Sequence, residues 1–417
     1  MLYKLNEHKR YVVFSYLAVA SNIITAFILF PLILENIGLE ALGVFGLLFS
    51  IKSIVDIGIG WLSSSMTKNL INYKYLVNNI LSLSFIINIV YGVIAFFIVY
   101  IYGYFTNYTY INSFFYFSIF VFISFSIIPF YEMMLANLKQ SQVAFFRFFQ
   151  QFLFMIFSIA SFKIIDAESL DIVFISLLIA SIINFLLILR FFIINFSFKF
   201  TINKAIKKIL HKLFINDGIS YFINGVSTIL LLQIDVLLID YFYGLKSVGI
   251  YLIIWKIPNT LIMLGWRLSE PFSVVVANGI KEYNKEIKNK FFNLEKKIFF
   301  AAIILALSYI IFGRFVLEFW LGSENIVEIK YMYIMSALVI FFSVLQRFYL
   351  SVNYYTSGLN LITILQFIEV SFKILFTILF FNYFNELAPI VGWLFAFIFT
   401  FYFYRKNALK VLIMEKI

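Results

Sequence analysis

The hydrophobic positions of the chain form twelve long runs that are separated by short polar segments. Each run holds about 20 mainly apolar residues, the length that an α-helix needs to cross the hydrocarbon core of a bilayer. The runs lie at residues 11–34, 41–63, 75–100, 113–135, 144–165, 172–194, 216–240, 247–269, 298–317, 331–354, 361–383 and 388–404. The pattern predicts an all-α membrane protein of about twelve transmembrane helices, with boundaries good to a few residues.

The composition agrees with lipid as the main solvent. Of the 417 residues, 63% are hydrophobic and 13% are charged, whereas soluble domains average about 45–50% apolar and about 25% charged residues. Cysteine is absent, which excludes disulfides and cysteine-ligated metals, and the two histidines stand alone in basic segments. No Walker A loop, zincin motif or dinucleotide fingerprint occurs. We therefore expect no catalytic residue, no metal, no cofactor and no nucleic-acid partner.

The basic residues between the runs assign the two sides of the membrane. Of the 32 Lys and Arg residues, 25 fall on the side of the N-terminus and four on the opposite side. Because cytoplasmic loops carry an excess of Lys and Arg, both termini are predicted to be cytoplasmic. The two longest segments between runs, 195–215 and 270–297, lie on the same side and are basic. The stretch from Lys281 to Lys297 is expected to lie along the anionic inner leaflet.

One sequence pattern occurs twice at an offset of about half the chain. Residues 38–45 read GLEALGVF and residues 244–251 read GLKSVGIY. Each copy follows the first run of a set of six runs, and each set starts on the cytoplasmic side. This predicts two six-helix lobes that run in the same direction, as in transporters built from parallel repeats. The predicted organisation is a lobe at 1–194, a basic cytoplasmic linker at 195–215, and a second lobe with a cytoplasmic tail at 216–417.

Six ionisable residues within the predicted spans are singled out as site candidates: Lys52, Asp56, Asp235, Lys256, Glu369 and Lys373. A charge near the middle of a bilayer is costly and usually faces a cavity or a partner. At 1.5 Å per residue, Lys52 lies about 16 Å below the outer surface and Lys256 about 14 Å below it. Asp56 stands one helical turn from Lys52, and Glu369 stands one turn from Lys373. Asp235 lies close to the outer end of its span.

Several short segments resemble one family of membrane transporters. They read FPLIL at 30–34, IGLEALG at 37–43, SIVDIG at 53–58, LQID at 232–235, YGL at 243–245, VGIY at 248–251 and WKIP at 255–258. The chain thereby resembles the O-antigen and capsule repeat-unit flippases, which are polysaccharide transporters of the multidrug/oligosaccharidyl-lipid/polysaccharide exporter superfamily. The span count matches over the whole chain, while the motifs cover a small part of it.

The resemblance implies both a shape and a cargo. The expected shape is two six-helix lobes around a central cavity that opens alternately to either side. The expected cargo is an undecaprenyl-pyrophosphate-linked oligosaccharide, an O-antigen or capsule repeat unit of lipopolysaccharide and related polysaccharides. The setting is then the bacterial inner membrane, and the partners are membrane lipids, a polysaccharide polymerase and chain-length machinery.

The membrane charges admit two interpretations. Lys52 and Lys256 are interpreted as a cationic cavity that binds the pyrophosphate, because an ammonium supplies three donors and a point charge. The alternative is structural: Lys52 pairs with Asp56 only to neutralise itself. Asp56, Asp235, Glu369 and Lys373 are assigned to ion coupling or to the cavity, with helix packing as the alternative.

Two other classes of protein stay open at this point. A small-molecule exporter of the same superfamily shares the fold, but an acidic site in its first helix would be expected. The first run, from Tyr11 to Leu34, contains no charged residue. A polysaccharide polymerase or a similar membrane enzyme usually has a large outer loop or domain, and the outer segments here are short.

Overall fold

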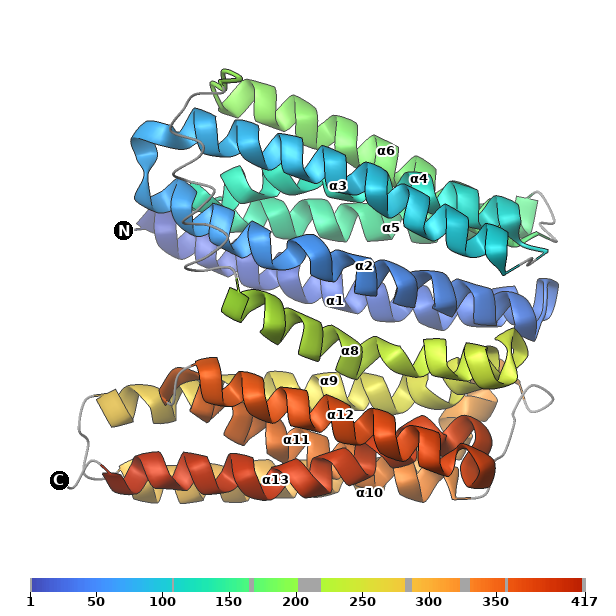
Figure 1. Ribbon diagram of the computed structural model, residues 1–417, viewed down its shortest axis with the longest axis vertical. Helices are drawn as coiled ribbons and strands as arrows, with labels where there is room; N and C mark the ends of the chain where they lie inside the picture. Colours follow the sequence, from blue (N-terminus) through green and yellow to red (C-terminus); the bar gives the residue numbers. More distant parts are fainter. Residues whose placement is uncertain are drawn as a thin grey trace. The chain divides into compact units, whose positions relative to one another are not determined.

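The computed structural model describes residues 2–106, 109–164, 169–201, 219–281, 287–322, 331–356 and 359–414. In these ranges the chain forms twelve α-helices, which follow one another as long antiparallel rods (Figure 1). The helices are α1 (Leu2–Asn36), α2 (Leu39–Asn72), α3 (Val77–Phe105), α4 (Ile111–Ala136), α5 (Gln140–Ile164), α6 (Leu170–Asn195), α8 (Ile219–Tyr243), α9 (Leu245–Lys281), α10 (Ile287–Leu321), α11 (Met332–Thr356), α12 (Leu359–Phe384) and α13 (Ala388–Met414).

The predicted fold class is confirmed. Eleven stretches of the described chain are long and apolar enough to cross a membrane, and the last of them, Leu361–Lys410, runs over both α12 and α13. Large apolar side chains also cover outward faces of the helices. On α10, Phe300, Ile304, Ile311 and Phe315 recur at helical spacing and are 62–66% exposed. Such a stripe suits contact with lipid, whereas in water it would be an exposed hydrophobic patch.

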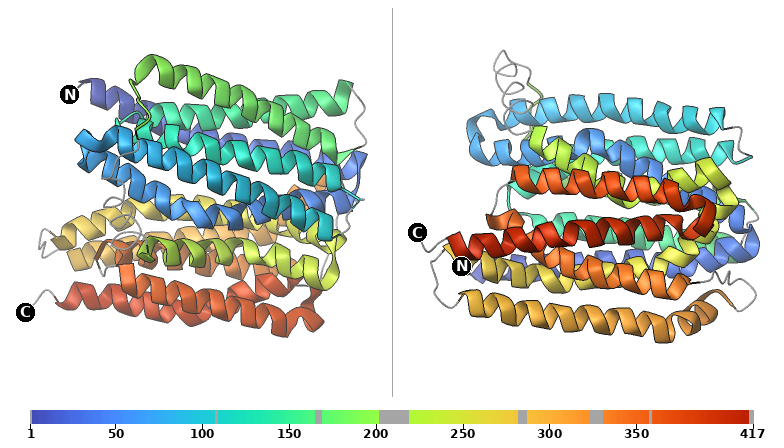
Figure 2. Two further views of the ribbon diagram at one scale, coloured as in Figure 1. Left: turned by 45° about the horizontal axis from the view of Figure 1, so that its top comes forward. Right: turned by 60° about the horizontal axis from the view of Figure 1, so that its bottom comes forward.

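The chain divides into two compact units, Met1–Gly225 and Val226–Ile417. The first unit contains α1 to α6 and the start of α8, and the second contains the larger part of α8 together with α9 to α13. Five pairs of helices pack in both units, whereas the extensive packing of α1 on α5 has no counterpart of similar extent between α8 and α12. The second helix packs on the third and fourth, the third on the fourth, and the sixth on the fourth and fifth. Figure 2 shows one such pair, α12 and α13, side by side over their length.

The repeated sequence pattern forms the same turn in both units. Gly38 precedes α2 with a φ of 114°, and Gly244 precedes α9 with a φ of 79°. Each glycine carbonyl accepts the first hydrogen bond of the following helix, from the amide of Leu42 and of Val248 respectively, both at 3.3 Å. A positive φ is strained for any residue with a Cβ, so the backbone itself favours glycine at both places.

The basic segment 270–297 does not form a separate surface helix where the structure describes it. Residues up to Lys281 continue α9, and residues from Ile287 onward begin α10, which runs unbroken to Leu321. No Gly or Pro interrupts the sequence between Ile287 and the apolar run. Glu295 on this extension pairs with Arg405 of α13 at 2.8 Å and accepts from the hydroxyl of Tyr349 at 2.5 Å. These contacts hold the extension against the second unit. Residues 282–286, and most of the predicted linker 195–215, lie outside the described residues.

Candidate functional site

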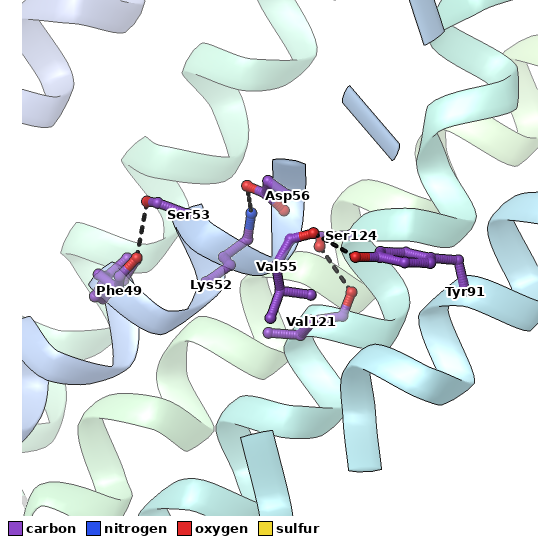
Figure 3. A network of polar contacts seen from close by, with 8 residues as sticks. All are labelled: Phe49, Lys52, Ser53, Val55, Asp56, Tyr91, Val121 and Ser124. Carbon is purple, nitrogen blue, oxygen red and sulfur yellow. Dashed lines mark hydrogen bonds and ion pairs between the residues drawn. The ribbon is translucent and has the colours of Figure 1, made fainter. Parts of the chain in front are cut away.

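Lys52 and Asp56 form an ion pair on one face of α2 (Figure 3). The ammonium nitrogen of Lys52 lies 2.7 Å from Oδ2 of Asp56, and the two side chains are 20% and 38% exposed. The pair is therefore half-buried, with one side open. Lys52 also lies over the ring of Phe120 on α4, with 6.0 Å between the nitrogen and the ring centroid. The geometry thus fits the structural interpretation, in which Lys52 pairs with Asp56.

The backbone next to this pair is fixed by α3. The hydroxyl of Tyr91 donates to the carbonyl of Val55 at 2.7 Å (Figure 3). Gly58 makes this approach possible, because a Cβ at that position would collide with the Tyr91 ring and hydroxyl. The stretch of α2 that carries Lys52 and Asp56 is therefore positioned by a contact that only a small residue allows.

Lys256 lies on α9, the helix of the second unit that corresponds to α2. Its side chain is half-buried, and its neighbours Trp255 and Ile257 are buried. The hydroxyl of Thr260 donates to the Lys256 carbonyl at 2.8 Å. Pro258 follows two residues later, and the missing amide of a proline leaves one carbonyl of the preceding turn without its usual partner.

The second unit contains a fully buried ion pair between α8 and α12. Nζ of Lys373 lies 2.8 Å from Oδ1 of Asp235, and the two side chains are 0% and 1% exposed. The other carboxylate oxygen, Oδ2, accepts from the hydroxyl of Tyr251 at 2.8 Å and from the indole of Trp393 at 2.9 Å. Lys373 also donates to the carbonyl of Leu231 and lies 4.1 Å from the centroid of the Trp393 ring.

This cluster joins four helices. Asp235 comes from α8, Tyr251 from α9, Lys373 from α12 and Trp393 from α13. Because both charges are out of solvent, each depends on the other and on the surrounding donors and acceptors. The cluster thus links these four helices by polar contacts in the interior of the second unit.

Glu369 and Lys373, which stand one turn apart on α12, do not form an ion pair with each other in the structure. The lysine reaches Asp235 on another helix, and Glu369 instead accepts from the side-chain amide of Gln346 at 2.8 Å and from the hydroxyl of Tyr404 at 3.2 Å. Positions four apart on a helix are close enough to pair. Here the helix is packed on two sides, and the side chains turn to different neighbours. Glu369 is buried as well.

Comparisons with solved structures show a shared fold. A multidrug resistance MATE family transporter of the MOP superfamily, in an inward-facing conformation, aligns over 95% of this chain and 95% of its own, with a TM-score of 0.69 and 13% identity. A Vibrio cholerae MATE transporter aligns over 99% and 98%, with a TM-score of 0.64 and 10% identity. The lipid II flippase MurJ aligns over 96% of this chain and 90% of its own, with a TM-score of 0.67 and 16% identity. The chain has the MATE and MurJ fold.

No protein-family model matches the sequence, and no curated protein matches it either. The likeness therefore lies in the three-dimensional arrangement of the helices. Within that fold, Lys52 pairs with Asp56 in the first unit and Asp235 pairs with Lys373 in the second, while Glu369 is hydrogen-bonded to Gln346 and Tyr404.

Four residues of the buried polar groups were not predicted from the sequence. Tyr251, Trp393 and Gln346 look like ordinary members of apolar helices, and only the packing reveals the charges they contact. Glu132 on α4 is different, because it is 1% exposed and is the one charged residue of the run at 113–135. It lies near the end of that run, where a charged residue is common at the membrane interface. A count of acids in each run would have found it.

Proposed function

We propose that the protein is a flippase that moves an undecaprenyl-pyrophosphate-linked oligosaccharide from the cytoplasmic to the periplasmic leaflet. The substrate would be an O-antigen or capsule repeat unit, moved by alternating access. The observation that supports this most is the fold, which the lipid II flippase MurJ shares over nearly the whole chain. The short sequence segments that resemble repeat-unit flippases point in the same direction.

The charges fit an anionic head group. Lys52 is 20% exposed on its open side, and Lys256 is half-buried in the corresponding helix of the other unit. We propose that each of the two ammonium groups contributes to binding the pyrophosphate. Two cations in surroundings of reduced dielectric attract a multivalent anion strongly. The sugars would then cross in water while the lipid tail stays in the bilayer.

Asp56 provides Lys52 with a partner in the absence of substrate. In the resting arrangement Lys52 is neutralised by Asp56 at 2.7 Å. A pyrophosphate that draws the ammonium away exchanges one ion pair for another, so the free energy difference between the loaded and empty sites stays modest. Such an exchange suits transport, because an anion that is bound only modestly in one state can be released when the protein opens to the other side.

The test is flipping by the purified protein in liposomes. The substrate is an undecaprenyl-pyrophosphate oligosaccharide with a fluorescent sugar, and a membrane-impermeant quencher measures the fraction that has crossed. Lys52→Gln and Lys256→Gln keep hydrogen bonding and length but remove the charge, so we expect flipping to fall at least tenfold. Arg at either position should retain part of the activity.

Matched controls are available on the same two helices. Lys68 on α2 and Lys246 on α9 are both exposed, and Lys68→Gln and Lys246→Gln should flip at the wild-type rate. Wild-type flipping by the Lys52→Gln/Lys256→Gln double variant would refute the role of the lysines. Absence of flipping by the wild-type protein, under conditions where purified MurJ flips its own lipid, would refute the function.

A small-molecule exporter is the second candidate. The observation that favours it is the fold shared with multidrug MATE transporters, at a TM-score of 0.69. Against it stands the first helix, which contains no acidic residue between Tyr11 and Leu34. Efflux of cationic dyes from the same liposomes separates the two candidates. We expect none above the level of empty liposomes.

A further inference from the structure

Glu132 is the buried acid of the first unit. It lies on α4 and is 1% exposed. The hydroxyl of Ser84 on α3 donates to its Oε2, and Ser63 on α2 is a further neighbour of the carboxyl group. Three helices of the unit therefore meet at this group. Their α2–α4 and α3–α4 contacts are among the main packing contacts of the unit.

No basic side chain among the described residues forms an ion pair with Glu132. On α2, Lys52 is paired with Asp56. On α5, Arg147 lies over the ring of Tyr131, the residue next to Glu132, at 5.4 Å from the ring centroid. On α3, the groups near Glu132 are the neutral Ser84 and Asn88, and Asp171 on α6 is bonded to Ser113 near the other end of α4. Glu132 thus differs from Asp56 and Asp235, which both have a lysine.

Two acceptor atoms in this group have no donor. Asn88 donates its amide to Oγ of Ser84 at 3.1 Å and to the Ser84 carbonyl at 2.9 Å, which links Asn88, Ser84 and Glu132 in one chain of contacts. Oδ1 of Asn88 and Oε1 of Glu132 are both buried without a hydrogen-bond partner. A buried acceptor without a donor is uncommon and calls for an explanation. One proton on Oε1 removes the charge and turns that oxygen into a donor.

The surroundings of Glu132 also favour a protonated carboxyl group. A carboxylate held inside a membrane protein without a cation is so costly that the group instead takes up a proton or binds a cation. Ser84, Asn88 and Glu132 are hydrogen-bonded in one chain of contacts, and Glu132 supplies the one carboxylate among them. A proton needs no further ligands, whereas a bound metal ion would need several oxygens.

We propose that Glu132 is a proton-binding site inside the first unit. The neutral form fits the packed interface of α2, α3 and α4 as observed. The charged form requires water or a cation, and hence a separation of these helices. A proton taken up on one side of the membrane and released on the other would then couple a proton gradient to movement of the unit. This coupling rests on the proposed transport function, whereas proton binding itself does not.

Infrared difference spectroscopy of the purified protein tests proton binding directly. The carbonyl stretch of protonated carboxylic acids is followed while pH is raised, in wild type, Glu132→Gln and the matched control Glu40→Gln, which alters an exposed acid. We expect a protonated band at neutral pH in wild type and in the control, with one component lost in Glu132→Gln. Identical bands in wild type and Glu132→Gln would overturn the proposal. So would loss of the component when sodium replaces potassium at constant pH, since the ligand would then be a metal ion.

A second variant covers the case in which Glu132→Gln does not fold. Ser84→Ala removes the hydroxyl that donates to the carboxylate, and that donor favours the charged form. The component should therefore persist to higher pH in Ser84→Ala than in wild type, and an unchanged titration would count against the site. In liposomes, an imposed pH gradient should accelerate flipping by wild type at least several-fold and leave Glu132→Gln at its gradient-free rate. Equal acceleration of both would overturn the coupling. If no protein flips substrate, the proposed function fails while the spectroscopic result stands on its own.

Discussion

Replacing Lys373 by Met should destabilise the second unit strongly, because Asp235 loses its cation in the interior and must either stay charged and unpaired or take up a proton. The two side chains are 0% and 1% exposed, and the pair distance is 2.8 Å. Removing one partner of a buried ion pair costs about 3–5 kcal/mol. For a unit of this size, about 2–4 °C of melting temperature is lost per kcal/mol, so we expect a fall of roughly 6–20 °C. The ring of Trp393, which lies 4.1 Å from the ammonium, loses a cation–π contact in addition.

The double variant separates the ion pair from simple packing. Asp235→Asn keeps an acceptor for Tyr251 and Trp393 and removes the charge that Lys373 neutralises. Exchanging a buried ion pair for neutral residues of similar volume is often close to neutral. Asp235→Asn/Lys373→Met should therefore be more stable than Lys373→Met alone by about 2 kcal/mol or more, a typical coupling for residues in one buried network.

Thermal unfolding in detergent, followed by tryptophan fluorescence, measures all three variants. Lys246→Met is the control, because Lys246 is exposed near the start of α9, where a change of charge should move stability by less than about 0.5 kcal/mol. A Lys373→Met protein within about 1 kcal/mol of wild type, the range of an exposed ion pair, would refute the reasoning. Additive losses in the double variant would refute it equally.

Two further predictions concern the backbone and the orientation. Gly244→Ala should lower stability by about 1–2 kcal/mol, because its φ of 79° is strained for alanine while no atom lies within 4 Å of the added Cβ. Gly60→Ala, also without a neighbour within 4 Å but inside α2, should instead raise it by about 0.5–1 kcal/mol; melting curves of equal sign would contradict this explanation. The native chain has no cysteine, so single cysteines can be labelled selectively. An impermeant maleimide should label Lys246→Cys from the outside of whole cells, and should label Lys290→Cys only from the cytoplasmic side. Labelling from the opposite sides would overturn the assigned topology.

The sequence was sufficient to predict features that depend on nearby residues. Long apolar runs predicted the helices, because only a helix satisfies its own backbone groups in lipid. The pairing of Lys52 with Asp56 was foreseen as one of two interpretations, since both lie on one helical turn. The spacing of the two glycine patterns located the same turn in both units.

Contacts between distant segments were not predictable in the same way. Asp235 and Lys373 meet only because α8 and α12 are neighbours, and no pattern in either helix carries that information. For the same reason the sequence shows only that Glu369 is the nearest acid to Lys373 along its own helix, and gives no sign of Asp235 as its partner. The burial of Glu132, near the end of its run, likewise depends on the packing of α2 and α3 against α4.

The equivalence of the two units also bears on how such a chain arises. A segment with six crossings ends on the side of the membrane where it began, so a second copy can follow it through a loop alone. Duplication and fusion of one gene would thus give two halves of the same orientation, without an extra crossing or an inverted copy. The glycine turns and five helix pairings are alike in both halves. The buried charges of the two halves differ, since Lys373 pairs with Asp235 in the second and no such buried pair is described in the first, and duplicated halves with different interiors are free to take different tasks.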